Sequence, residues 1–378
     1  MKLKRSVLAA GAAIAIALGA APVAQSATVT PAEVAGNAAV GTVRPMTSAD
    51  VPNAVTTGAP QQWYADYVDG DKVEAYIVTS PSMNNREIPV AVIPARDADG
   101  NRVDNAPTVY MLNGAGGAEQ DADWLRQTEG LDFYQNKGVN VVIPQAGAFS
   151  YYMDWEDDVN TRYLQGGPQK WETFITKELP GPIEAELGAN NQRATVGFSM
   201  SATSSLLHAQ HNPGFYDAVG SFSGCAATST FNTYEYMRLT VNRGGSEPEN
   251  MVGPMGSRHN RHNDALLSAH RFQDTNTKLY VSTGTGLAGE TDMAGYYRDR
   301  GMDATTASAQ AGVLQVEGGV IEAAMNQCTH DLKAKTDSLG MADRTHYELR
   351  NTGTHSWPSW REDLELSWTK TIKPAFGL

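Results

Sequence analysis

Short runs of β-branched and aromatic residues alternate with segments of helical periodicity along most of the chain after residue 107. Strands separated by helical crossovers pair in parallel, so this alternation predicts an α/β fold with a mostly parallel central sheet and helices on both faces. Two earlier runs, joined by the turn-rich stretch SPSMNNRE, predict an antiparallel hairpin at the sheet edge. The expected strands are 75–79, 88–93, 108–112, 139–143, 194–198, 218–222, 279–282 and 346–350, and the expected helices are 171–179, 200–211, 320–339 and 361–370.

A single domain is expected over residues 61–378, with one insertion inside it and one extension before it. Residues 230–276 break the alternation with a Gly-Gly pair, two prolines and the polar string SRHNRHND. An insertion of this size between strands favours a lid or a substrate wall. Residues 28–60 are rich in Ala, Val, Thr, Pro and Gly without a sustained period, which predicts a loosely ordered N-terminal extension.

The first 27 residues have the pattern of a secretory signal peptide. A positively charged start precedes an apolar run over 7–21, and small residues over 24–27 offer a cleavage site. We therefore expect an exported protein whose mature chain has no integral membrane segment. Cys225 and Cys328 are the two cysteines, and in an exported chain they favour a disulfide; two unpaired buried thiols are the alternative.

The formal net charge is −13, and it becomes more negative once the basic residues of the signal peptide are removed. An acidic surface argues against binding nucleic acid or, by charge, an anionic membrane. It leaves neutral sugar and lipid substrates open.

The stretch TVGFSMSATSSLL reads as a strand, a sharp turn and a helix, with Ser199 at the turn. An α/β-hydrolase presents its nucleophilic serine in this way, over the carboxyl edge of the sheet. Gly197 supplies the first of the two flanking glycines. Ser201 replaces the second, and it is small enough for the turn to form.

A serine nucleophile needs a histidine base, which in this fold comes late in the chain, after the acid. His330 falls in an expected helix and His346 in an expected strand. His355 lies in the polar turn NTGTHSWPSW directly after the last strand, and we favour it. For the acid, pattern alone places Asp292 or Glu290, which follow strand 279–282, slightly ahead of Glu322.

The oxyanion that forms during acyl transfer requires two preorganised backbone N–H donors. Met200, directly after the serine, would supply one, and the glycine-rich loop 113–117 the other. A dinucleotide-binding motif starting at Gly114 would need glycine at Glu119, so that interpretation is rejected. His259 and His262 lack an evident third ligand, and no metal site or cofactor is predicted.

Six motifs occur in an order that resembles the secreted mycolyltransferases of mycolate-walled bacteria, a family of α/β-hydrolases. The resemblance covers residue 75 to the C-terminus and is weaker in the insertion. The motifs are SPSM (80–83), DADW (121–124), YYMDW (151–155), KWETFITKELP (170–180), GFSMSATSSL (197–206) and GTHSWPSW (353–360).

The resemblance implies a set of site residues. It implies Ser199 as nucleophile, His355 as base and, against the preference from pattern, Glu322 as the acid. The oxyanion donors become the N–H groups of Ala115 and Met200. Four further positions match the family's sugar-binding region: Asn113, Gly114, Ser356 and Trp357. The family's loop reads Asp-Gly-Leu-Arg where this chain has Asn113 to Gly116, so a carboxylate and a guanidinium that grip trehalose are absent.

The activity implied is transfer of a mycoloyl group from trehalose monomycolate, through an acyl-serine, to a second trehalose monomycolate, to cell-wall arabinogalactan or to another envelope hydroxyl. The long N-terminal extension and the two cysteines resemble a corynebacterial paralogue, which implies a short corynomycoloyl chain. Two alternatives are a secreted carboxylesterase with the same triad and a catalytically idle envelope or host-matrix binding protein. The location implied is extracellular, in the cell envelope.

Overall fold

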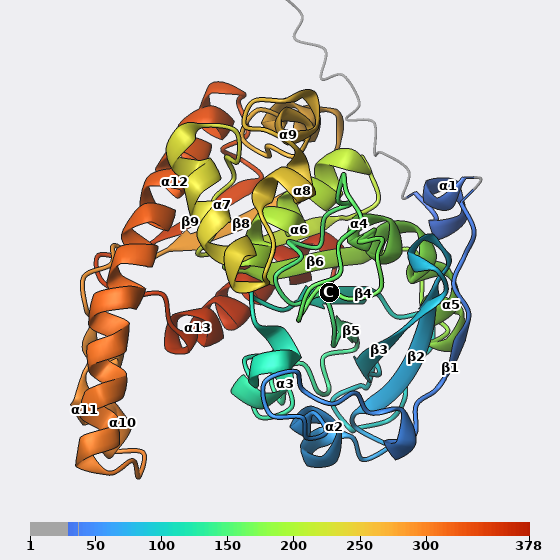
Figure 1. The fold of residues 1–378 in the computed structure, drawn as a ribbon. Coiled ribbons are helices and arrows are strands. Elements are labelled where there is room, and N and C mark those ends of the chain that lie inside the picture. The colour runs from blue at the N-terminus through green and yellow to red at the C-terminus, as the bar shows by residue number, and fades with distance from the viewer. Residues whose placement is uncertain (1–28, 37) are drawn as a thin grey trace, which may run out of the picture.

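The computed structural model describes residues 29–36 and 38–378, whose strands form one nine-stranded sheet in the order β1-β2-β3-β5-β4-β6-β7-β8-β9 (Figure 1). Strands β5, β4, β6, β7, β8 and β9 are mutually parallel, and β1, β2 and β3 add an antiparallel edge. All eight expected strands are present. The strands are β1 (Val43–Pro45), β2 (Glu74–Ser80), β3 (Arg86–Ile93), β4 (Thr108–Leu112), β5 (Asn140–Pro144), β6 (Arg193–Phe198), β7 (Ala218–Phe222), β8 (Lys278–Thr283) and β9 (Thr345–Leu349).

The segment expected to be a loosely ordered extension differs from that prediction. Its residues 43–45 form β1, which pairs with β2 and so takes the sheet edge that the hairpin was expected to occupy. Backbone hydrogen bonds from Gly41 to Glu178 and from Met46 to Ala75 hold both ends of this strand. Three residues are too few to show a period, which explains why the pattern missed them. The proposed signal peptide lies outside the described residues.

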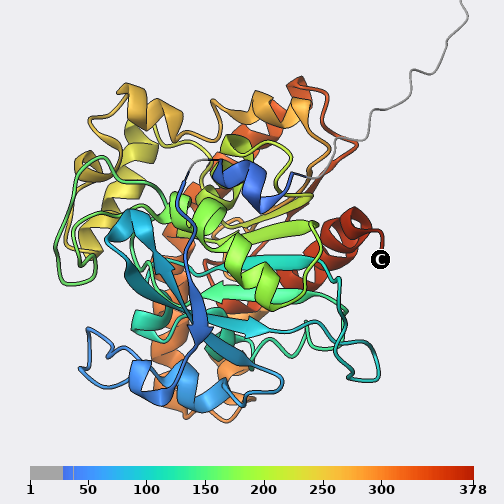
Figure 2. The same ribbon diagram turned by 90° about the vertical axis from the view of Figure 1, so that its right-hand side faces the viewer.

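Helices cover both faces of the sheet, as predicted, because successive side chains of each strand point to opposite sides. Tyr110 and Leu112 of β4 face a core that includes residues of α6, whereas Val109 and Met111 face a second core that includes α13. Figure 2 shows the C-terminal helices on one side of the strands. The helices are α1 (Pro31–Ala35), α2 (Gln62–Tyr67), α3 (Trp124–Gln127), α4 (Trp171–Thr173), α5 (Pro180–Glu186), α6 (Met200–His211), α7 (Phe231–Arg243), α8 (Pro248–Val252), α9 (Arg258–His262), α10 (Ala294–Arg298), α11 (Ala304–Val313), α12 (Gly319–Ser338), α13 (Trp357–Ser367) and α14 (Lys373–Phe376).

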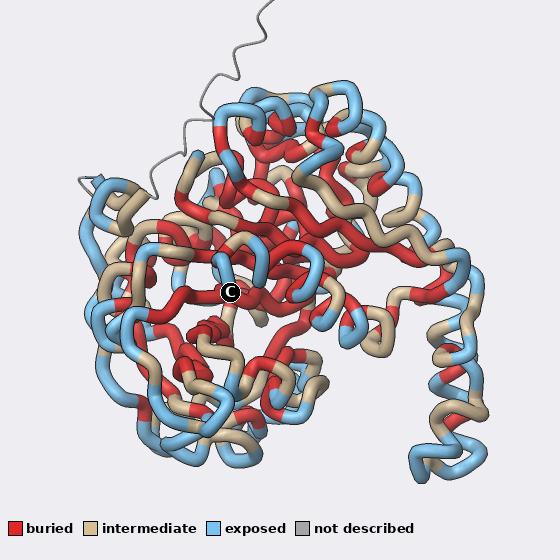
Figure 3. Tube along the Cα trace, turned by 180° about the vertical axis from the view of Figure 1, so that it is seen from behind, coloured by how far each residue is buried: buried red, intermediate tan, exposed pale blue. Residues whose placement is uncertain are grey.

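The segment between β8 and α12 contains an element that the sequence pattern did not predict. Helices α10 and α11 pack against each other as a hairpin that extends away from the body of the molecule, at the lower left of Figure 1. Most of its surface is exposed (Figure 3). Residues 314–318 form wider helical turns that join α11 to α12, so one continuous helical segment runs from the hairpin to the body.

In the part of the chain that the structure describes, we find no helix with the length and apolar character needed to cross a bilayer.

Asp123 of the DADW motif is fully buried at the N-terminus of α3. One carboxylate oxygen accepts hydrogen bonds from the N–H groups of Leu125 and Arg126, at 3.0 and 3.2 Å, and the other oxygen has no partner in the described chain. Burial outweighs these bonds and raises the pKa of Asp123 to about 6. The folded state therefore binds this proton more tightly than the unfolded chain, in which the pKa is near 3.8.

This difference predicts a stability loss with rising pH. The contribution from Asp123 is fully present below about pH 4 and is lost as the pH rises through 6, by about 3 kcal/mol in total. Asp123→Asn should remove this slope when urea unfolding is measured from pH 4 to 7. Asp303→Asn is the matched control: Asp303 caps α11 through the same two bonds but is exposed, and hydrogen bonding lowers its pKa. The Asp303→Asn variant should keep the dependence of unfolding free energy on pH that the wild type shows. Equal pH dependence in the wild type and in Asp123→Asn would contradict the assignment to Asp123.

Candidate active site

The candidate site lies where loops from five parallel strands meet at the carboxyl edge of the sheet. These loops follow β4, β6, β7, β8 and β9, which are neighbours in the sheet order. Because the strands are parallel, side chains far apart in the sequence are brought to one edge, which is the usual location of ligand sites in open α/β sheets.

Ser199 occupies the strained turn between β6 and α6. Its backbone has φ 55° and ψ −121°, a conformation that residues with a side chain rarely adopt and that is typical of functional turns. At Gly197 an added Cβ would lie 2.2 Å from the Ser201 carbonyl oxygen, so this position requires glycine. Ser201 is fully buried; its hydroxyl accepts a hydrogen bond from Phe198 N–H at 3.1 Å and donates to Leu112 O at 2.9 Å. The hydroxyl of Ser201, the residue that stands in place of the expected glycine, therefore stabilises the turn.

A hydrogen-bonded chain joins a serine, a histidine and a glutamate. The Ser199 Oγ lies 2.8 Å from Nε2 of His355, and Nδ1 of the same ring lies 2.8 Å from Oε2 of Glu322. Glu322 is buried, and the His355 side chain is only 10% exposed. With Nδ1 protonated, the ring donates to Glu322 and leaves Nε2 free to accept the serine proton, which is the arrangement that makes a hydroxyl nucleophilic.

Three donors orient the other oxygen of the Glu322 carboxylate. The hydroxyls of Ser223 and Thr283 and the N–H of Gly284 donate to Oε1, at 2.9, 3.0 and 2.7 Å. They come from the ends of β7 and β8. Helix α12 and the sheet together therefore set the position of the carboxylate, which a sequence pattern cannot reveal.

The other acid and base candidates that the sequence pattern left open lie outside this hydrogen-bonded chain. Glu290 is exposed, and His330 is exposed on α12. His346 lies in β9 and stacks on Tyr280, with ring centroids 5.4 Å apart.

Asp292, the other acid that pattern favoured, is fully buried and holds the loop that carries His355. Its Oδ1 accepts hydrogen bonds from the hydroxyls of Thr354 and Ser356 at 2.7 and 3.1 Å, and its Oδ2 accepts one from Thr354 N–H. It is thus bonded to both neighbours of His355. Because the Ser356 hydroxyl is used in this way, it is less available to a sugar than the resemblance implied, although Ser356 still lines the cavity.

Ala115 and Met200, the two expected oxyanion donors, lie beside Ser199: Met200 follows it in the chain, and Ala115 lines the same cavity. Met200 is the first residue of α6, so its N–H has no acceptor within the helix. The Ala115 carbonyl accepts a hydrogen bond from Phe149 N–H at 2.7 Å, and the Met200 sulfur accepts one from Tyr151 N–H at 3.3 Å. These bonds, from a residue before the YYMDW motif and from its first residue, hold the carbonyl of Ala115 and the side chain of Met200.

Asn113 does not line the cavity, which differs from the sugar contact that we expected. It is buried; its amide nitrogen donates to Pro144 O at 3.2 Å, and its amide oxygen accepts from Trp124 N–H at 3.0 Å. Both ends of the side chain are used to hold the loop. Gly114 does line the cavity, and an added Cβ there would lie 2.5 Å from the Phe198 ring.

The cavity at Ser199 and His355 has a volume of about 480 Å³. Trp357 lines it, as expected, and packs against Trp360 and Phe198 with ring centroids 5.1 and 4.7 Å apart. From the insertion 230–276, expected to be the wall, only Arg243 contributes. Residues in and beside the α10–α11 hairpin form that wall instead: Tyr296, Tyr297, Arg300, Met302, Gln310 and Leu314. The paired tyrosines and the helix-capping Asp303 were the sequence signals available for it.

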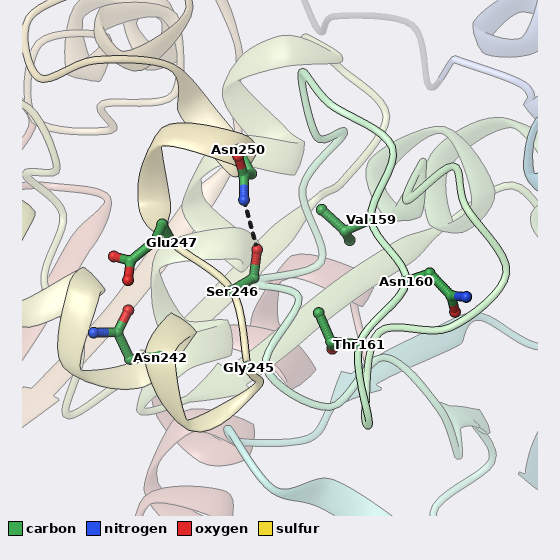
Figure 4. Close-up of a pocket in the computed structure, with 8 residues that line it drawn as sticks. All are labelled: Val159, Asn160, Thr161, Asn242, Gly245, Ser246, Glu247 and Asn250. Atoms are coloured by element: carbon green, nitrogen blue, oxygen red, sulfur yellow. Dashed lines mark hydrogen bonds between the residues drawn. The ribbon is translucent and has the colours of Figure 1, made fainter.

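A second cavity, of about 440 Å³, lies between α7, α8 and the loop at 159–161 (Figure 4). Its eight lining residues include one carboxylate, Glu247, but neither a histidine nor a cysteine. Asn250 donates to the Ser246 hydroxyl at 3.0 Å, as the dashed line in Figure 4 marks. No nucleophile and base are paired there, so it does not compete with the site at Ser199.

His259 and His262 belong to a polar cluster on α9. His262 stacks on His211 with ring centroids 4.1 Å apart, and His211 Nδ1 lies 2.9 Å from Glu172 of the KWETF motif. Burial acts to lower the pKa of His211, but Glu172 outweighs it and raises the pKa above its ordinary value. Within residues 29–36 and 38–378, no group of three or more His, Cys, Asp or Glu side chains is arranged to hold a metal ion.

Cys225 and Cys328 form a disulfide. Cys225 follows Ser223 by two residues, and Cys328 lies on α12 six residues after Glu322. The bond therefore links the loop that donates to the Glu322 carboxylate with the helix that carries it.

Loss of this bond should reduce both stability and activity. It closes a loop with a separation of 103 residues, and replacing both cysteines by serine should lower the free energy of unfolding by about 4 kcal/mol. Ester turnover should fall as well, because Glu322 is less firmly held. Urea unfolding and turnover with and without dithiothreitol test this: the reductant should affect the wild type and leave the double variant unchanged. An unaffected wild type whose thiols are shown to be reduced would contradict the prediction.

Comparison with known proteins identifies relatives with a stated activity. A family profile described as a putative esterase matches residues 80–367. The diacylglycerol acyltransferase/mycolyltransferase Ag85A of Mycobacterium tuberculosis is 28% identical over 264 residues, which cover 69% of this chain and 71% of that protein. Ag85A of Mycobacterium leprae is 28% identical over 300 residues, covering 78% and 81%. These relatives confirm the resemblance to mycolyltransferases inferred from the motifs.

Solved structures confirm the fold. MPT51 (FbpC1) of Mycobacterium tuberculosis superposes with a TM-score of 0.61 at 22% identity, covering 78% of this chain and 96% of that one. The fluorophosphonate-binding serine hydrolase FphF of Staphylococcus aureus gives a TM-score of 0.53 at 12% identity, covering 79% and 96%. Together with the sheet order, these similarities confirm the expected α/β-hydrolase fold.

Proposed function

The chain belongs to the putative esterase family, and on that basis we propose that it is a serine-dependent acyltransferase that moves a mycoloyl group between hydroxyls. The observation that carries the proposal is the hydrogen-bonded chain Ser199–His355–Glu322, which opens into a cavity. The mycolyltransferase relatives support the acyl group. The proposed donor is trehalose monomycolate with a short, corynomycoloyl-type chain, and the proposed acceptor is a second trehalose monomycolate, arabinogalactan or another envelope hydroxyl.

In the first half-reaction, Ser199 Oγ attacks the ester carbonyl carbon while its proton passes to His355 Nε2. The carbonyl oxygen becomes an oxyanion, which the N–H groups of Ala115 and Met200 stabilise. Glu322 stabilises the imidazolium through Nδ1–H. The tetrahedral intermediate then collapses, the ester C–O bond breaks, and His355 returns the proton to the departing trehalose oxygen. An acyl-serine remains.

In the second half-reaction, the acceptor hydroxyl attacks the acyl-serine carbonyl carbon and gives its proton to His355. The bond from carbon to Ser199 Oγ breaks, and the proton restores the serine hydroxyl. Water competes in this step, so transfer requires that the acceptor be held in line. Good positioning is worth effective molarities of about 10⁵ M or more, which is enough to outcompete water at 55 M. The wall formed by the α10–α11 hairpin is the proposed positioning surface.

A secreted carboxylesterase is the second candidate, supported by the description of the family and by the serine hydrolase among the structural relatives. Incubation with trehalose monocorynomycolate separates the two, because transfer yields the diester and free trehalose in equal amounts. Hydrolysis yields the free acid instead. The assay is repeated with arabinogalactan added as a further acceptor. If the free acid is then the sole acyl product, the transferase proposal is overturned and the esterase is established.

We propose that the protein acts outside the cytoplasmic membrane, in the cell envelope. The disulfide Cys225–Cys328 supports this location, since such bonds persist in oxidising compartments.

A further inference from the structure

The cavity at Ser199 has an unusual charge for so acidic a chain. Three arginines line it, Arg243, Arg300 and Arg361, and none of its lining residues is an aspartate or glutamate. The whole chain carries a formal net charge of −13. A cationic cavity in an acidic protein concentrates positive potential at the one place where substrate must enter.

Neutral groups alone hold these three arginines. Arg243 donates to the side-chain oxygen of Gln120 at 3.2 Å, Arg300 to the carbonyl of Tyr296 at 3.1 Å, and Arg361 to the carbonyl of Gln127 at 2.6 Å. In the described chain, none of the three forms an ion pair with a carboxylate.

Several arginines elsewhere in the protein do form ion pairs with carboxylates. Arg193 pairs with Glu184, Arg238 with Glu235, Glu247 and Glu249, and Arg350 with Glu362 and Asp363. Other arginines of the described chain, such as Arg86 and Arg162, also lack an ion pair, so what distinguishes the three cavity arginines is that they line one cavity that contains no carboxylate.

We infer that the cavity binds an acyl acceptor that carries a phosphate group close to its reacting hydroxyl. Guanidinium groups match phosphate in geometry and charge, and their bonds to it are about twice as strong as those between neutral groups. This inference rests on the proposed acyl transfer. The proposed donor, a trehalose ester, is uncharged, so the anionic group belongs to the acceptor. The arginines come from α7, the α10–α11 hairpin and α13, so three separate elements each contribute one guanidinium group to the cavity lining.

Binding to the Ser199→Ala variant tests this inference without requiring turnover. Calorimetric titrations with trehalose 6-phosphate, trehalose and inorganic phosphate separate a sugar phosphate from a neutral sugar and from free phosphate. In 50 mM NaCl, trehalose 6-phosphate should bind at least about tenfold more tightly than either of the others. The preference should shrink in 0.5 M NaCl, because exposed charges are screened.

Variants assign the effect to the named side chains. Arg300→Gln and Arg361→Gln, each in the Ser199→Ala background, should lose most of the preference for the phosphate. Arg298→Gln is the matched control, since Arg298 is exposed on α10 and does not line the cavity. Equal affinity for trehalose and trehalose 6-phosphate would overturn the inference, as would a preference that survives the combined Arg300 and Arg361 variants, or equally tight binding of inorganic phosphate.

Failure of this inference is distinguishable from failure of the proposed function. The titrations measure only how affinity depends on the charge of the ligand. The product assay with trehalose monocorynomycolate measures whether the acyl group is transferred to a hydroxyl or to water.

Discussion

Replacing Ser199 by alanine is expected to reduce ester turnover by about 10⁶-fold, to the level supported by the oxyanion donors and binding alone. Within the residues that the structure describes, Ser199 Oγ is the group that lies 2.8 Å from Nε2 of His355, and no other side chain is hydrogen-bonded to that nitrogen. Turnover of a p-nitrophenyl ester and covalent labelling by a fluorophosphonate probe measure the loss, and labelling should disappear entirely.

Ser201→Gly is the matched control on the same turn. It restores the glycine usual in α/β-hydrolases and removes the hydrogen bonds of the Ser201 hydroxyl. We expect a lower midpoint of thermal unfolding with turnover and labelling retained. Retained turnover in Ser199→Ala would end the case for an acyl-serine. A wild type that neither turns over the ester nor reacts with the probe would leave the catalytically idle binding protein as the remaining alternative.

Glu322→Gln is expected to lower kcat by about 10⁴-fold, by analogy with the loss of the acid in serine protease triads. The amide cannot stabilise the imidazolium by charge. The amide oxygen of the variant is expected to keep the three donors that now bind Glu322 Oε1. The amide nitrogen then faces His355 Nδ1, which favours the tautomer protonated on Nε2, and this tautomer cannot accept the serine proton. KM should change little, because Glu322 is buried and does not line the cavity.

The two acids favoured by pattern provide the comparison. Glu290→Gln should behave as the wild type, since Glu290 is exposed. Asp292→Asn should reduce kcat by a smaller factor and lower stability, because it weakens the anchoring of the loop on both sides of His355 without touching the ring. A severe loss of kcat in Asp292→Asn combined with a mild one in Glu322→Gln would reverse the two assignments.

Much of the fold could be predicted because its information is local. Strands β4 and β7 begin and end where the β-branched runs do, and α6 spans the predicted residues. Both faces of the sheet are buried, so the strands are almost continuously apolar and easily recognised. The turn at Ser199 was also predictable, because a strand, a small flanking residue and a helix follow one another directly.

The α10–α11 hairpin was missed for a physical reason. Its helices are short, and few of their residues are buried, so they lack the apolar period that reveals a helix packed on a sheet. Asn113 was misjudged because its role depends on two backbone groups, of Pro144 and Trp124, that the fold brings to it.

By itself the sequence determined strands β2 to β9, the serine turn and the motifs that indicate mycolyltransferase relatives, because each depends on neighbouring residues or on a short recognisable string. Only the tertiary structure decided which carboxylate meets His355, which residues wall the cavity and how its charge is balanced. Those properties depend on side chains that are distant in the sequence, 33 positions for His355 and Glu322 and 156 for His355 and Ser199, and packing and sheet order set their separations in space.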